Sequence, residues 1–201
     1  RSTGNESSGG AVTLTGGDGA DGGGVTLVGG HGAVSGGDIM LTAGTGPEDS
    51  TGGKVNVVGG AYSGEVSIEG GASESDDTSG GTVKVAGGAG GGDVIVVSGT
   101  SKSRSGAMFV GTSDGMESGS VMIQSGQAES GASGTVVLES GSGISESGMV
   151  ALRAGASEHT DGGLVSLEAG SSGSADGNGG GVTARGGDGV EGGDISFLAG
   201  H

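Results

Sequence analysis

Carboxylates gather in the polar segments between short apolar stretches, and they are the side chains of this chain best suited to chemistry. Seven of them fall in three such segments near the amino-terminal end, namely Asp18, Asp21, Glu48, Asp49, Glu74, Asp76 and Asp77. Carboxylate oxygens are hard ligands that suit Ca²⁺ or a mineral surface. Their pattern therefore raises the hypothesis of an acidic, Ca²⁺-binding edge, and the alternative is a solvated edge that keeps copies of the chain apart.

No known calcium motif fits these segments. A calcium-binding nonapeptide repeat carries Gly-Gly-x-Gly-x-Asp, and the nearest match, residues 87–93, places Asp93 one position too late. No metal ligand set is therefore assigned, and no cofactor is predicted, with Ca²⁺ kept as a hypothesis.

Catalytic patterns are missing from the sequence. His31, His159 and His201 stand far apart, each in a polar segment or at the end of the chain. No Ser–His–Asp order stands out, and the Gly-rich runs lack the strand–loop–helix context and the Lys of a phosphate-binding loop. The sequence therefore predicts a protein that is not an enzyme.

Composition limits the partners. The 201 residues include 56 Gly, one Pro and no Cys, and the formal net charge is −17. Such a charge argues against binding to nucleic acid and to anionic membrane surfaces. No apolar run reaches the roughly 18 residues of a membrane span. Divalent cations and basic surfaces are the partners that this charge favours.

A nine-residue repeat organises the chain. Residues 9–17 read GGAVTLTGG, and fourteen copies of this unit follow one another with a mean spacing near 14 residues. Gly occupies position 2, apolar residues occupy positions 4 and 6, a small residue occupies position 8, and Gly or once Ser occupies position 9. Segments of two to eight residues connect the copies. Constant units with variable connections are typical of repeat proteins.

The alternation within each unit predicts a strand, because apolar residues two apart share one face. We expect an all-β fold, a parallel β-solenoid of 14 short strands in two facing sheets, with about seven two-strand coils and Gly-rich turns. Positions 2 and 8 would let the sheets approach, and the position-9 Gly would turn the chain through a positive φ. An antiparallel meander or barrel and a solenoid with one strand per coil are the alternatives.

Residues at position 5 would point outward from such sheets and would offer an interaction face. One column of this face carries no charge. Its members proposed for interaction are Thr13, Met40, Ile95, Met122, Ala151 and Thr183. Flat solenoid faces with Thr rows resemble those of ice-binding proteins, but only Thr13 with Thr15 approximates such a row.

The repeats resemble those of Gly/Ser-rich parallel β-solenoid proteins of cell surfaces and extracellular fibres. That resemblance covers residues 1–201 as a single repeat domain and implies a non-enzymatic building block of an extracellular filament, sheath or surface layer. Copies would associate laterally and end to end, and the array would continue beyond one chain. Ice binding through a flat face is the alternative function.

Overall fold

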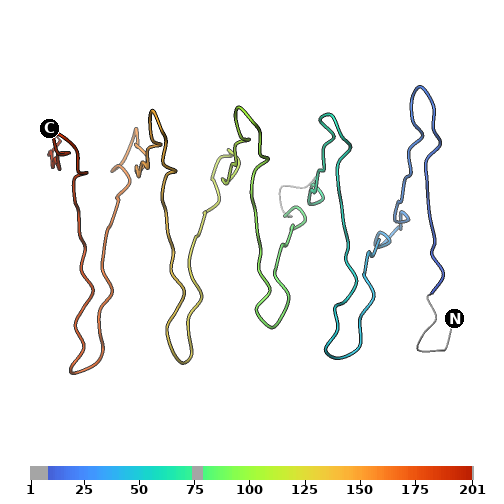
Figure 1. Cartoon of the computed structure of the whole chain (residues 1–201), viewed down its shortest axis with the longest axis horizontal. Helices are drawn as coiled ribbons and strands as arrows, with labels where there is room; N and C mark the ends of the chain where they lie inside the picture. Colours follow the sequence, from blue (N-terminus) through green and yellow to red (C-terminus); the bar gives the residue numbers. More distant parts are fainter. Residues whose placement is uncertain (1–8, 74–78, 201) are drawn as a thin grey trace. The chain divides into compact units, whose positions relative to one another are not determined.

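Extended segments joined by loops make up the chain. The computed structural model describes residues 9–73 and 79–200, and the chain has neither a helix nor a strand in these ranges. Figure 1 shows the backbone running in long, nearly straight stretches that reverse at narrow loops. Within the described ranges, no helical segment could span a lipid bilayer.

Two units divide the chain, Arg1–Thr100 and Ser101–His201. The repeat runs through both of them without a change of pattern. The eighth repeat begins just after the boundary between the two units. A single repeat domain over residues 1–201 therefore stays a prediction.

The all-β prediction is wrong for the described residues. A parallel β-solenoid with two facing sheets requires ladders of backbone hydrogen bonds between neighbouring strands. Instead, each backbone–backbone hydrogen bond of the described residues is local and joins two residues in or beside the same loop. Alternation gives an extended segment, but only a hydrogen-bonded neighbour makes that segment a strand. The small apolar content and the many glycines oppose such ordering, since Gly loses the most conformational entropy.

The described chain has no core. No hydrophobic or polar residue is buried, and the accessible surface is 20,232 Å². A compact protein of 18.3 kDa would expose about 8,100 Å², and the same chain fully extended about 26,500 Å². The chain alone therefore hides about a quarter of its extended surface, whereas a compact protein of this size hides about 70%.

Single hydrogen bonds between glycines close the loops, and we call each such closure a neck. In the first neck, the N–H of Gly23 donates to the carbonyl of Gly17 over 2.8 Å. The donor is position 2 of one repeat, and the acceptor is position 9 of the repeat before it. Nine necks are closed in this way: Gly17–Gly23, Gly30–Gly37, Gly44–Gly53, Gly60–Gly64, Gly71–Gly81, Gly88–Gly92, Gly155–Gly163, Gly170–Gly180 and Gly187–Gly193.

Positive φ angles lie inside the loops and not at position 9, so that expectation is wrong. The two shortest closed loops, 61–63 and 89–91, each hold two consecutive residues of this kind. In the second loop they are Gly90 and Gly91, with φ of 91° and 95°. In the first loop they are Tyr62 and Ser63, with φ of 60° and 75°. A side chain in this conformation costs on the order of 1 kcal/mol or more.

Replacing Ser63 with Gly is expected to strengthen the neck between Gly60 and Gly64. The change removes a strained side chain, and about 1 kcal/mol corresponds to roughly fivefold slower exchange of the Gly64 amide hydrogen. Amide exchange measured by NMR checks this result. Gly91→Ser is the reciprocal variant and should speed the exchange of Gly92. Unchanged exchange in both variants would contradict the assignment of strain.

Candidate functional site

The residue at position 8 lies against the neck that follows it. A methyl group built on Gly16 would overlap the carbonyl oxygen of Gly23, the donor residue of its neck. The same overlap occurs in every closed neck whose position-8 residue is Gly. The position-8 glycines concerned are Gly16, Gly29, Gly59, Gly70, Gly87 and Gly186.

Alanine is also compatible with closure. Ala43, Ala154 and Ala169 precede closed necks, with neck hydrogen bonds of 2.8 to 2.9 Å. The Ala154 Cβ lies 3.1 Å from the place where a Cβ on Gly163 would be, so the donor position has no room for a side chain there. Position 2 is therefore crowded in most closed necks, where Gly lets the two backbones meet, although a Cβ on Gly180 would be in ordinary contact.

Hydroxyl side chains at position 8 coincide with open necks. The three junctions within the second unit that follow Thr112, Ser125 and Ser140 have no backbone hydrogen bond between positions 9 and 2. At one of them the Ser140 hydroxyl donates to the carbonyl of Gly148 over 2.8 Å. Serine and threonine hydroxyls compete for backbone partners in this way. The size and chemistry of position 8 thus divide the necks into a closed and an open class.

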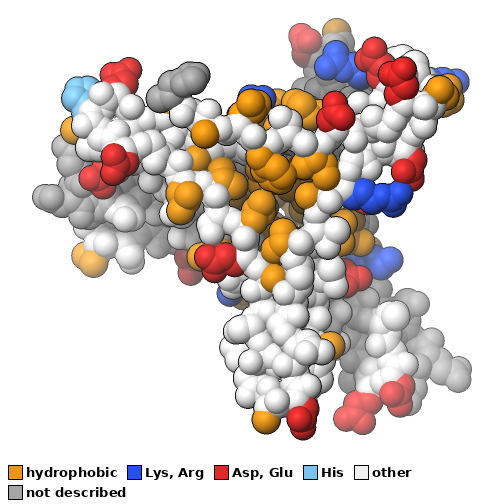
Figure 2. All heavy atoms as spheres, turned by 90° about the vertical axis from the view of Figure 1, so that its left-hand side faces the viewer, with side chains coloured by type: hydrophobic (Ala, Val, Ile, Leu, Met, Phe, Trp, Pro, Cys, Tyr) orange, Lys and Arg blue, Asp and Glu red, His pale blue; other side chains and the backbone are white. Residues whose placement is uncertain are grey.

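Apolar side chains at positions 4 and 6 are exposed throughout the repeats. Position 4 is the more sheltered, with exposed fractions from 44% at Val150 to 64% at Val182, apart from Val12 at 89%. At position 6, the exposed fractions of the large side chains range from 63% at Leu27 to 90% at Phe197. Figure 2 shows hydrophobic side chains at the surface in this view. The two rows predicted to fill a core are therefore free to contact another molecule.

The residues predicted to form an interaction face are exposed as well. Met40, Ile95 and Met122 have exposed fractions of 87%, 78% and 77%. Thr13, Ala151 and Thr183 are also exposed. Because positions 4 and 6 are exposed too, position 5 is not distinguished as the outer side.

The acidic residues that the structure describes do not meet in a metal site. Asp18, Asp21, Glu48 and Asp49 lie exposed in their loops. The predicted residues Glu74, Asp76 and Asp77 lie outside the described ranges. Among residues 9–73 and 79–200, no three His, Asp or Glu side chains come together in a group that could hold a metal ion. The calcium hypothesis therefore gains no geometric support from the described residues.

One ion pair occurs in the described residues, and it is local. Arg185 donates to both carboxylate oxygens of Asp188, over 2.8 and 2.9 Å. Both side chains are largely exposed, and Arg185 comes directly before the position-8 residue Gly186. Exposed pairs of this kind contribute up to about 1 kcal/mol to stability, and this one spans three residues.

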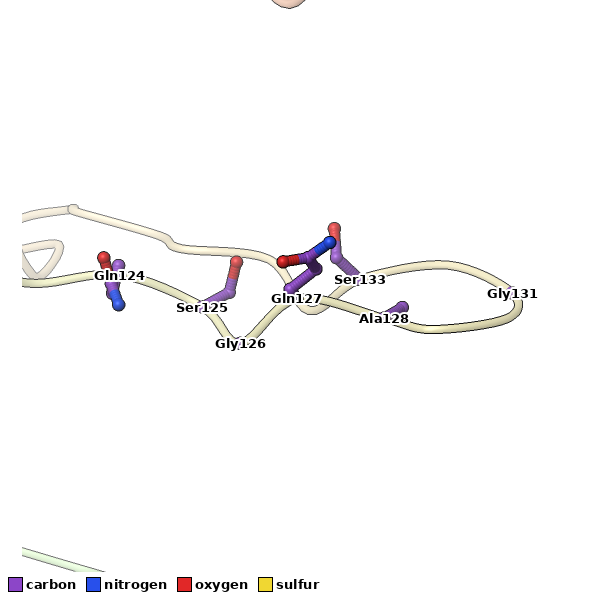
Figure 3. A pocket seen from close by; sticks show the side chains of 7 residues that line it. All are labelled: Gln124, Ser125, Gly126, Gln127, Ala128, Gly131 and Ser133. Carbon is purple, nitrogen blue, oxygen red and sulfur yellow. The ribbon is translucent and has the colours of Figure 1, made fainter.

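A shallow hollow of about 590 Å³ lies at the open loop after Ser125. Figure 3 shows Ser125, Gln127 and Ser133 extending from one side of this loop. The hollow has no ionisable side chain in its lining, and so it offers no acid, base or nucleophile pair of the kind that catalysis needs. Its lining residues are Gln124, Ser125, Gly126, Gln127, Ala128, Gly131 and Ser133.

The histidines do not add a site. His31 and His159 are exposed in different loops, and His201 lies outside the described residues. The hydrogen bond at His159 is one that its backbone N–H donates to the Ser157 hydroxyl, over 3.4 Å. A comparison with protein-family models, curated proteins and solved structures finds no match to this chain.

Proposed function

We propose that this chain is a non-enzymatic structural protein whose copies associate into an extracellular filament, sheath or surface layer. The observation that carries the proposal is the exposure of the apolar residues at positions 4 and 6 in both units. Monomeric soluble proteins rarely expose large contiguous apolar areas, and larger areas mark interaction sites. Each repeat contributes to this exposure, so the contact surface grows with the number of repeats.

Association supplies what the single chain lacks. Burial of apolar area contributes about 25 cal/mol per Å², and a stable interface buries about 1,200–2,000 Å². The excess of about 12,000 Å² over a compact chain of this size exceeds that requirement several-fold. The extended segments also have backbone N–H and C=O groups that bond to no other segment in the described residues. Neighbouring copies can bury the apolar side chains against each other and can form hydrogen bonds between these backbone groups.

Positions 4 and 6 are the main contact rows in this proposal. They are apolar in every repeat, whereas position 5 is apolar in only some, as at Met40 and Ile95. The apolar residues at position 5 extend the contact. Ice binding through a flat face depended on the two-sheet solenoid, which the described residues do not form, and no other observation favours it.

Concentration-dependent assembly tests the function. Purified chain is expected to form fibres or sheets visible by electron microscopy, and the sedimenting fraction should rise steeply above a critical concentration. Dilution below that concentration should return single chains. A chain that sediments as a monomer at every concentration up to its solubility limit, with no assemblies in the micrographs, would contradict the proposal.

A further inference from the structure

Most connecting loops are acidic, and one is basic. Nine of the thirteen connections between repeats carry Asp or Glu, while residues 100–104 carry Lys102 and Arg104 and no acid. The chain has five other cations, of which Lys54, Lys84, Arg153 and Arg185 lie within repeats. Residues 101–104 of this connection, which we call the basic segment, therefore form the one cationic loop among the described residues.

Among residues 9–73 and 79–200, the basic segment has no acidic partner. The ion pair of the described residues joins Arg185 to Asp188, and neither Lys102 nor Arg104 takes part in one. Both side chains are exposed. The backbone N–H of Ser103 bonds to the Ser101 hydroxyl over 3.3 Å, which holds a local turn between the two cations. Two positive charges are thus presented to solvent at the start of the second unit.

Charge limits how two copies can approach. Each copy carries a net charge of −17, so any two acidic loops from two copies repel each other. The basic segment is the loop at which a second copy is attracted. Electrostatic complementarity of this type fixes register and raises the association rate more than it raises affinity.

We propose that the basic segment docks on an acidic loop of a second copy and sets the register of the assembly. This inference rests on the proposed function. The partner is a second copy because nine loops of the same chain carry the complementary charge at the repeat spacing. The apolar rows supply most of the affinity, and the contact between loops limits the registers to those in which the basic segment lies beside an acidic loop.

Removing the two cations tests the proposal. Lys102→Ser/Arg104→Ser is compared with Lys84→Ser/Arg153→Ser, which removes one Lys and one Arg from within repeats and gives the same net charge. At about 0.01 M salt, where the Debye length is about 30 Å, we expect assembly of the first variant to be about tenfold slower than that of the natural chain. The second variant should stay within about twofold.

Added salt sharpens the comparison. The difference between the first variant and the natural chain should disappear at about 1 M salt, where the Debye length is about 3 Å. Equal slowing of both variants would overturn the proposal, because net charge alone would then explain the effect. If both variants assemble like the natural chain, the proposal also fails, while the proposed function stands. If no chain assembles, both fail.

Zero-length cross-linking locates the contact directly. A carbodiimide joins a Lys amine to a carboxylate that it touches, and an equal mixture of ¹⁵N-labelled and unlabelled chains separates links between copies from links within one. We expect isotopically mixed peptides joining Lys102 to an acidic loop. Mixed links that involve Lys54 or Lys84 as often as Lys102, or no mixed links in assembled material, would overturn the proposal.

Discussion

Replacing Gly16 with Ser is expected to open the neck between Gly17 and Gly23, whereas Ser at Gly17 leaves it closed. A side chain at Gly16 would meet the carbonyl of Gly23, and a Ser hydroxyl there can bond to the backbone as Ser140 does, while nothing lies within 4 Å of a Cβ on Gly17. The three open necks within the second unit all follow Ser or Thr at position 8. The neighbouring glycine is therefore a matched control, with the same new side chain one residue away.

The size of the effect follows from one hydrogen bond. A net contribution of about 0.5–1.5 kcal/mol corresponds to about two- to twelvefold faster exchange of the Gly23 amide hydrogen. Gly16→Ala should keep the bond after a local shift, since Ala43 precedes a closed neck. NMR exchange of the Gly23 amide at a concentration below assembly measures all three variants. Faster exchange in Gly17→Ser than in Gly16→Ser would refute the role given to position 8.

Three Leu→Ser substitutions in the contact rows are expected to raise the critical concentration for assembly at least about a hundredfold. Leu138, Leu152 and Leu167 occupy position 6 of consecutive repeats, with exposed fractions of 66% to 71%. Burial of each Leu contributes about 1.5–3 kcal/mol, and a hundredfold change corresponds to about 2.7 kcal/mol. The expected effect therefore holds even if the assembly covers these side chains only in part.

The matched control removes the same number of apolar side chains from position 5. Met40→Ser, Ile95→Ser and Met122→Ser together should raise the critical concentration less than tenfold, because position 5 is not apolar in every repeat. Sedimentation over a dilution series measures both triple variants. A larger loss from the position-5 variant would show that this face, and not the rows at positions 4 and 6, is the interface.

The repeat and its connecting segments are properties of the sequence, but the fold predicted from them is wrong for the described residues. Position 2 and position 9 meet at the nine closed necks, whereas the sequence analysis expected Gly at position 2 to let two sheets approach. The two-sheet solenoid was wrong because alternation of apolar residues states which side chains share a face and says nothing about a hydrogen-bonded neighbour. A strand depends on that neighbour, and no pattern within one repeat specifies it.

Some local features were open to sequence reasoning and others were not. The signal for open necks is visible as Thr112, Ser125 and Ser140 in consecutive repeats, where most other repeats have Gly or Ala. Grouping these residues simply as small concealed the difference, since a hydroxyl can bond to the backbone. The positive φ of Tyr62 and Ser63 has no compositional signal, because it follows from closing a three-residue loop.

The candidate site could also be predicted from the sequence only in part. The acidic loops and the uncharged position-5 column were found by counting residues at fixed offsets, and their described members are exposed. The exposure of the side chains at positions 4 and 6 could not be predicted, because both positions were assigned to a core that the described residues do not form. The predicted roles of these residues stay predictions until association is measured.

The closed necks also determine how the chain responds to tension. A closed neck carries force directly between its two glycines, so the loop that it encloses does not bear the load. Breaking the bond between Gly170 and Gly180 releases the nine residues 171–179, which is about 30 Å of additional length. The open loops after Thr112 and Ser125 have no neck bond and would bear the load from the start, whereas the loop after Ser140 is bridged by its hydroxyl. Under tension, the second unit is therefore expected to extend first at the open loops. The closed loops add length only after their neck hydrogen bonds break.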